Sequence, residues 1–190
     1  MATSSMSTAG SPPACKGLAV VVMGVSGAGK TTVAKSLAKR LGAVFVDGDD
    51  VHTDEARAKM RSGKPLDDAD RWPWLDRIGA ALAVGLHAES GAVVACSALK
   101  RAYRDRLRAA AGPALRFVYL EADPEAMRRR VGGRSGHYMP ATLVDSQFAA
   151  LEPPQDEPDV IVVSAQADVE TTVADLAARL ASSSAPAGKP

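Results

Sequence analysis

The chain contains no asparagine, and this absence excludes one class of nucleotide-binding proteins. GTPase switches read guanine through an Asn-Lys-x-Asp motif, which this sequence cannot form. Cysteine is almost as scarce, with only Cys15 and Cys96. Cys15 lies in a tail of small residues and Cys96 ends an apolar run, so we expect no structural disulfide. A reducing compartment, the cytoplasm, is the predicted location.

An excess of charge of either sign is also lacking. Lysine and arginine number 23 and aspartate and glutamate 22, which gives a net charge of +1. This balance provides no electrostatic basis for binding nucleic acid or an anionic membrane surface. No apolar stretch is long enough to cross a bilayer. We therefore expect neither nucleic acid nor a membrane among the partners.

The length of 190 residues fits a single domain with a substantial core. Residues 1–16 are rich in Ser, Thr, Ala and Pro and contain no acidic residue and no arginine. Transit peptides are usually rich in arginine, so a disordered leader is the preferred interpretation over organellar import. Residues 182–190 form a similar tail. The predicted domain therefore spans residues 17–181.

A glycine-rich segment early in the chain has the form G-x-x-x-x-G-K-[ST] of a phosphate-binding loop. An apolar run at 18–23 precedes it and a helical pattern at 30–41 follows it, as the motif requires. Glycines let successive backbone N–H groups point at a polyphosphate, and the helix N-terminus adds partial positive charge. Lys30 is expected to reach the β- and γ-phosphates, and Thr31 to hold Mg²⁺. The candidate nucleotide-binding residues are Gly24, Val25, Ser26, Gly27, Ala28, Gly29, Lys30 and Thr31.

Short apolar runs alternate with helical patterns along the rest of the domain. Strands are predicted at 18–23, 43–46, 92–96, 115–120 and 160–163. Helices are predicted at 30–41, around 54–61, and at 74–89, 101–111, 124–131, 141–151 and 169–181. This alternation predicts an α/β fold of three layers, with a five-stranded parallel sheet and helices on both faces. Ligands of such sheets bind at the carboxyl ends of the strands.

Acidic residues follow the second predicted strand, in the segment Asp47-Gly48-Asp49-Asp50. One carboxylate there could support Mg²⁺ and another could accept the proton of an acceptor hydroxyl. An Asp/Gly turn is a common alternative, but a neighbouring phosphate loop favours function. The third predicted strand is followed by Ser97-Ala98-Leu99-Lys100 and not by an acid. Lys100 is equally consistent with an anion contact and with a solvated position.

Basic residues follow the fourth predicted strand, in Arg128-Arg129-Arg130 and, after two glycines, Arg134. Glycine hinges and arginines that pair with phosphate oxygens predict a mobile lid at about 124–140. An exposed basic helix face is the alternative for one or two of these arginines. Residues 52–74 would overhang the strand ends, where Lys59 and Arg71 could fix an acceptor carboxylate. We expect Trp74 to anchor the following helix.

Several segments together resemble the gluconokinase family from about residue 18 to residue 180. Beside the phosphate loop, the matching segments are Asp47-Gly48-Asp49-Asp50-Val51-His52, Lys59-Met60, Gly63-Lys64-Pro65-Leu66, Asp70-Arg71-Trp72-Pro73-Trp74-Leu75, Cys96-Ser97-Ala98-Leu99-Lys100, Tyr103-Arg104-Asp105, Leu107-Arg108, Arg134-Ser135-Gly136-His137-Tyr138 and Ser146-Gln147-Phe148. A phosphate loop is shared by many unrelated enzymes, whereas this combination is far more specific. Two positions depart from the family pattern, because Thr53 and Ala56 stand where relatives often carry Pro and Asn.

The resemblance implies ATP-dependent phosphorylation of D-gluconate to 6-phospho-D-gluconate, which feeds the pentose phosphate pathway. It implies a P-loop kinase fold like that of shikimate and adenylate kinases, and a homodimer. Its cofactors are ATP and Mg²⁺, and its partner is a small molecule. The implied catalytic residues are Lys30, Asp49, Arg130 and Arg134; the implied metal ligands are Thr31 and Asp47; the implied substrate contacts are Asp49, His52, Lys59, Arg71, Lys100 and His137.

Two alternatives stay open at the level of sequence. Another small polyol acid, such as shikimate, could be the acceptor. The chain could also be a nucleotide-binding module without activity, although Lys30, Thr31, Asp47 and Asp49 argue against this.

Overall fold

The computed structural model describes residues 17–183, except 63, 89 and 133–140. Its five strands form one parallel sheet, as the sequence predicted, and the strand order is β2-β3-β1-β4-β5. Their bounds are β1 Ala19–Met23, β2 Val44–Asp47, β3 Ala92–Ala95, β4 Leu115–Glu121 and β5 Val160–Ser164. The predicted leader, most of the tail and the second half of the predicted lid, residues 133–140, lie outside the described residues.

The central strand β1 is the structural base of the phosphate loop. Ala19 pairs with Ala92 of β3 on one side and with Leu115 of β4 on the other. All five residues of β1 are buried, because helices cover both faces of the sheet. Continuous apolar strands such as this one are typical of parallel sheets that are buried on both faces.

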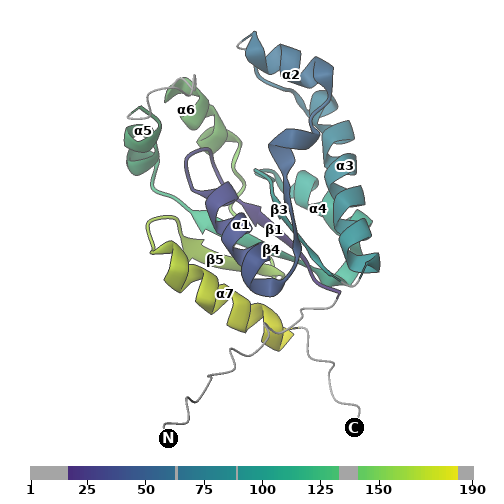
Figure 1. The fold of residues 1–190 in the computed structure, drawn as a ribbon. Helices are drawn as coiled ribbons and strands as arrows, with labels where there is room; N and C mark the ends of the chain where they lie inside the picture. Colours follow the sequence, from purple (N-terminus) through teal and green to yellow (C-terminus); the bar gives the residue numbers. More distant parts are fainter. Residues whose placement is uncertain (1–16, 63, 89, 133–140, 184–190) are drawn as a thin grey trace, which may run out of the picture.

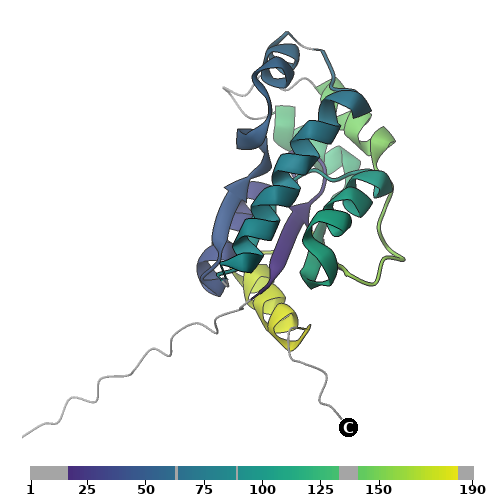
Figure 2. The same ribbon diagram turned by 90° about the vertical axis from the view of Figure 1, so that its right-hand side faces the viewer.

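The two faces of the sheet have separate cores (Figure 1). Helices α1, Lys30–Leu41, and α7, Val169–Ser183, cover one face with side chains such as Leu37 and Leu176. Helices α3, Asp68–His87, and α4, Arg101–Ala111, cover the other face, where Ile78 and Leu107 are buried. Figure 2 shows α3 and α4 side by side on this face. The helical periodicity of the sequence thus matches the buried faces.

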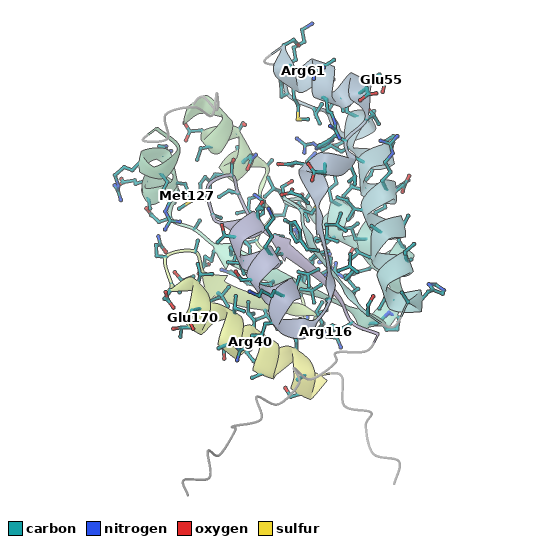
Figure 3. All side chains as sticks on the ribbon, viewed as in Figure 1. Arg40, Glu55, Arg61, Arg116, Met127 and Glu170 are labelled. Atoms are coloured by element: carbon teal, nitrogen blue, oxygen red, sulfur yellow. The ribbon has the colours of Figure 1, made fainter. Side chains whose placement is uncertain are left out.

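Smaller elements gather where the strands end (Figure 1). They are the 3₁₀ helix η1 Gly48–Val51 and the helices α2 Asp54–Arg61, α5 Pro124–Gly132 and α6 Ala141–Ala150. A further 3₁₀ helix, η2 Gly112–Ala114, lies at the other end, directly before β4. Figure 3 labels Glu55 and Arg61 on α2, at the end of the molecule opposite α7, and Met127 on α5. Met127 is fully buried and joins α5 to the core that contains α1.

Helix α3 begins six residues before the predicted start at residue 74. Asp67 accepts a hydrogen bond from Asp70 N at 3.0 Å, and Asp70 Oδ2 accepts one from Asp67 N at 2.9 Å. This reciprocal capping box stabilises the first turn, and Pro73 lies inside the helix, beyond that turn. Across the described residues, no helix is both long and apolar enough to cross a membrane.

Candidate active site

The phosphate loop joins β1 to α1 and has the backbone conformation that its glycines permit. Gly24, Gly27 and Gly29 have φ of 140°, 84° and 94°. A Cβ at Gly24 would lie 2.9 Å from the carbonyl oxygen of Leu120, so this position also needs glycine for space. Gly29 is the N-cap of α1 and has no side chain to bond the first amides of the helix. These amides can therefore bind an anion.

Lys30 begins α1 and folds back over the loop. Its Nζ donates a hydrogen bond to the carbonyl oxygen of Val25 at 3.0 Å. Desolvation by the surrounding protein lowers the pKa of Lys30, and the negative charges of Asp49 and Asp47 oppose that shift. A phosphate bound in the loop would act in the same direction as these carboxylates, because it favours the charged amine. The position and electrostatics of Lys30 suit its predicted contact with phosphate.

Thr31 and Asp47, the two predicted metal ligands, lie side by side. Thr31 Oγ1 donates to Asp47 Oδ2 at 3.1 Å, and Asp47 Oδ1 accepts a hydrogen bond from Asp49 N at 3.1 Å. A hydroxyl beside a carboxylate suits Mg²⁺, which keeps several waters and takes further oxygen ligands from phosphates. Within the described residues, no group of three or more His, Cys, Asp and Glu side chains forms a metal cage. This donor set therefore fits a metal that arrives with a nucleotide.

Asp49 lies in η1, and the neighbouring elements fix the position of that short helix. Trp74 Nε1 donates to the carbonyl oxygen of Gly48 at 2.6 Å. A Cβ at Gly48 would lie 2.5 Å from the carbonyl oxygen of Ala95, so glycine is required for η1 to pack this closely on β3. Asp49 is exposed, and its charge is the largest one opposing the lowered pKa of Lys30. The negative charge of Asp49, the predicted base, therefore acts on Lys30, the lysine predicted to contact phosphate.

His52 follows η1 and is 7% exposed. Its ring stacks on Trp74, with centroids 4.5 Å apart and an interplanar angle of 7°. Burial lowers the pKa of His52, which favours the neutral imidazole. Its Nδ1 is buried and has no hydrogen-bond partner among the described residues. A polar ligand would satisfy this atom, which agrees with a substrate contact.

Two of the predicted cationic contacts to the acceptor, Lys59 and Lys100, are already paired with acids at the start of α3. Lys59 Nζ lies 3.0 Å from Asp67 Oδ2 and also contacts Asp70. Lys100 Nζ lies 2.7 and 2.9 Å from the two carboxylate oxygens of Asp68. Sequence reasoning assigned no role to these acids, although three aspartates at one helix start were a visible signal.

Aromatic rings complete this cationic region. The Tyr103 hydroxyl donates to Asp68 at 2.5 Å, and Lys100 lies 5.5 Å from the centre of the Tyr103 ring. The Arg71 guanidinium lies over the same ring, 5.9 Å from its centre. Trp72 meets Tyr103 edge to face, with centroids 5.5 Å apart. Two predicted substrate cations, Arg71 and Lys100, thus share one aromatic platform.

The two departures from the family pattern belong to one interaction. Thr53 is the N-cap of α2, and its Oγ1 accepts a hydrogen bond from Ala56 N at 3.0 Å. The Ala56 side chain is buried, at 4% exposure. A threonine cap gives α2 a well-defined start where a proline could offer no such oxygen.

The loop that carries Lys100 is fixed by a buried arginine, Arg104, which is 1% exposed. Arg104 donates to the carbonyl oxygens of Ala98 and Leu99 at 3.1 and 2.9 Å, and its Nε donates to Glu157 at 3.0 Å. Ala98 has φ of 43°, the one left-handed non-glycine residue in the described part of the chain. Sequence reasoning quoted Arg104 only within a matching segment and missed this role, which depends on distant carbonyl groups.

The three consecutive arginines of α5 differ in position. Arg128 pairs with Asp145 of α6 at 2.7 Å, and Arg129 lies 3.7 Å from Glu125. Arg130 instead donates to the carbonyl oxygen of Ala165 at 3.3 Å. It lines a cavity with Gly27, Gly29 and Ala167, between the phosphate loop and the segment after β5. The exposed-face interpretation therefore fits Arg128 and Arg129 better than Arg130.

Two predicted site residues, Arg134 and His137, lie outside the described residues. The structure brings Lys30, Thr31, Asp47 and Asp49 together at the phosphate loop. It places His52 directly after η1, Lys59 on α2, Arg71 on α3 and Lys100 in the loop before α4. A donor side and an acceptor side thus meet at the carboxyl ends of the strands, as parallel sheets dictate.

The fold and the site together define a P-loop phosphotransferase. A family model described as an AAA domain matches residues 20–154. The chain is 49% identical over 152 residues to a probable gluconokinase from Schizosaccharomyces pombe, covering 77% of this chain and 79% of that protein. It is 46% identical to a gluconokinase from Gluconobacter oxydans, covering 83% and 88% of the two chains. A crystal structure of a gluconokinase from Sinorhizobium meliloti superposes with a TM-score of 0.79 and 40% identity, covering 88% and 94%. The chain belongs to the gluconokinase family, as the sequence motifs indicated.

Proposed function

We propose that this enzyme transfers the γ-phosphate of ATP to D-gluconate and releases 6-phospho-D-gluconate and ADP. The observation that supports the proposal is the arrangement of Thr31, Asp47 and Asp49 around Lys30 and the phosphate loop, in a chain 49% identical to a probable gluconokinase. Shikimate is not favoured as acceptor, because the matching relatives are gluconokinases.

The donor side binds the nucleotide mainly through its backbone. Amides of residues 24–31 surround the phosphates, and Lys30 contacts the β- and γ-phosphate oxygens. Thr31 and Asp47 would hold Mg²⁺, which supplies neutralisation of phosphate charge when bound. The cavity lined by Arg130 and Ala167 extends from the loop and takes the nucleoside end of ATP. Arg130 therefore contacts the nucleotide at the edge of the site.

Asp49 acts as the general base toward the acceptor hydroxyl. It is exposed and stands beside Lys30, so a hydroxyl bound between Asp49 and the γ-phosphate can lose its proton as it attacks. The buried Nδ1 of His52 takes a hydrogen bond from an acceptor hydroxyl group. His52 and Asp49 together orient the polyol.

The carboxylate of gluconate binds the cations of the acceptor side. Lys59, Arg71 and Lys100 supply positive charge, and the aspartates of α3 hold the two lysines in place before substrate arrives. Arg134 and His137 are assigned to the phosphate and the substrate by resemblance to the family.

The assay that tests the proposal is coupled ADP release with D-gluconate, shikimate or no acceptor. We expect release that depends on gluconate and a product with phosphate on a gluconate hydroxyl. Lys30→Met serves as the control for contaminating kinases. Nucleotide binding without ADP release in the presence of either acceptor would support the inactive-module interpretation, and release with shikimate alone would overturn gluconate as the acceptor.

Two further properties follow from the family. We propose that the enzyme is a homodimer and that it acts in the cytoplasm. Light scattering of the full chain during size-exclusion chromatography tests the first, with a mass near twice 19.7 kDa expected. Imaging of a C-terminally tagged chain tests the second.

A further inference from the structure

One contact at the phosphate loop comes from a distant part of the chain. The backbone N–H of Ser26 donates a hydrogen bond to Oε1 of Gln147 at 2.6 Å. Ser26 is the third residue of the loop, and Gln147 lies on α6, 121 positions later. Gln147 belongs to the Ser146-Gln147-Phe148 segment, which matches the family but received no role in the site described above.

Helix α6 holds Gln147 firmly relative to both sides of the site. Val144 is fully buried on this helix, and Phe148 packs against the core that contains α1. The chain after α6 is bonded to the acceptor side, because Glu152 N donates to the carbonyl oxygen of Leu99 at 3.0 Å and Arg104 donates to the Glu152 carbonyl at 3.0 Å. Helix α6 and the segment after it therefore connect the phosphate loop, through Gln147, with the loop that carries Lys100, through Glu152.

The chemistry of the amide decides which way Gln147 faces. An N–H group can donate only to the amide oxygen, so Oε1 must turn toward Ser26 and Nε2 must turn away. Nε2 has no hydrogen-bond partner among the described residues, and Gln147 is only partly buried. Its two hydrogens lie at the edge of a loop whose amides are arranged to bind phosphate. An uncharged double donor there is suited to a γ-phosphate oxygen.

We propose that Gln147 is a γ-phosphate-binding residue, which holds Ser26 through Oε1 and donates through Nε2 to the phosphate being transferred. The proposal rests on the proposed kinase function of the same site. It explains why one amide of the loop is paired with a side chain of another helix. Because ADP lacks the γ-phosphate, the residue would distinguish ATP from ADP and stabilise the transferring group.

The test compares Gln147→Ala and Gln147→Glu with the wild-type enzyme. Calorimetry measures binding of ADP and of a non-hydrolysable ATP analogue, and these values need no acceptor. We expect either variant to lose affinity for the ATP analogue about tenfold or more, while ADP affinity stays within about twofold. Gln147→Glu keeps an acceptor for Ser26 but puts negative charge where Nε2 was, so its loss should be the larger.

Turnover and a control complete the test. We expect kcat to fall on the order of 10²-fold in Gln147→Ala, with KM for gluconate unchanged. Gln155→Ala, an exposed glutamine in the segment after α6, should match the wild type in every measurement. Thermal unfolding shows whether each variant is folded, and Gln147→Glu, of nearly equal shape, serves if Gln147→Ala is not.

Three results would overturn the proposal. Tighter nucleotide binding in Gln147→Ala would mean that the side chain only blocks the loop. An equal loss of ADP and ATP-analogue affinity would mean that it only shapes the loop. Wild-type affinity and kcat in both variants would remove any role. If the wild type binds ATP but shows no turnover with gluconate, the acceptor assignment fails while the binding comparison still stands.

Discussion

The donor and acceptor sides of the site are built by different means. The donor side is mainly the backbone of the phosphate loop, placed at the end of the fully buried strand β1. The acceptor side is a set of charged side chains on α2, α3 and the loop before α4, where Lys59 and Lys100 remain 31% and 34% exposed. Partly exposed ion pairs contribute about 0–1 kcal/mol each. The donor side is therefore fixed by the fold, whereas the acceptor side can exchange partners when substrate binds.

The largest predicted effect comes from the residue between the two sides. Asp49→Asn should lower kcat about 10²–10⁴-fold, because the variant keeps the shape but cannot accept the acceptor's proton. Nucleotide affinity should change little, since Asp49 bonds the predicted metal ligand Asp47 through its backbone N–H, which the variant keeps. Steady-state kinetics with calorimetry of ADP binding checks this. Near-normal turnover at unchanged affinity would remove the base assignment.

The donor side itself is tested at Lys30. Lys30→Met should lower kcat about 10²–10³-fold and weaken ATP more than ADP, because the lysine reaches the γ-phosphate. Lys39→Met, at the exposed end of the same helix, is the control and should retain wild-type kinetics. Equal effects of the two substitutions would contradict the proposed contact.

The buried ion pair of Arg104 and Glu157 links the stability of the protein to the loop that carries Lys100. Glu157→Gln should lower the free energy of unfolding by about 3 kcal/mol, because Arg104 then lacks its buried partner. Denaturant titration measures this. Glu125→Gln, which breaks an exposed pair on α5, should change stability by less than about 0.5 kcal/mol. A change in the free energy of unfolding of less than about 0.5 kcal/mol in Glu157→Gln would contradict the proposed contribution of this ion pair to stability.

The same ion pair predicts acid sensitivity. Burial raises the pKa of Glu157, but hydrogen bonds from Arg104 and Arg108 outweigh it and lower the pKa to about 2. A carboxyl with a depressed folded pKa stabilises the protein above its unfolded pKa, near 4.5. This stabilisation should therefore be lost as pH falls from about 5 toward 2. Glu157→Gln should make the free energy of unfolding less dependent on pH between about 5 and 2. An unchanged pH dependence in this variant would argue against the role of Glu157.

The smallest effect is expected on the acceptor side. Asp68→Asn frees Lys100 from its ion pair, so KM for gluconate should fall about two- to fivefold at low salt, with kcat unchanged. Asp76 lies on the same helix as Asp68 and forms an exposed ion pair with Arg106 of α4. Asp76→Asn, which breaks that pair, should leave KM for gluconate unaltered. A rise in KM would mean that Asp68 positions Lys100 and does not compete with substrate.

The donor side was predictable from sequence because its information is local. Eight consecutive residues form the phosphate loop, and the predicted helix at 30–41 is the observed α1. The five strands were found within two residues of their ends, since apolar runs between turn residues define buried strands. The resemblance implied Thr31 and Asp47 as metal ligands, and the structure places the two side chains in contact.

The acceptor side was less predictable because its contacts join distant segments. The start of α3 was predicted six residues too late. Proline disfavours the interior of a helix, but the capping box of Asp67 and Asp70 starts the helix before Pro73. The pairing of Lys100 with Asp68 spans 32 positions, and that of Ser26 with Gln147 spans 121. Such pairs depend on how helices pack, which local patterns do not encode.

The position of β1 has a consequence for how the enzyme is made. This strand leaves the ribosome first, yet its two neighbours in the sheet begin at Ala92 and Leu115. The phosphate loop cannot acquire its shape until both neighbours have been synthesised, because an unpaired central strand has no sheet to hold it. Nascent chains halted before residue 115 should therefore fail to retain ATP. The nucleotide site, which begins nearest the N-terminus, becomes competent only late in translation.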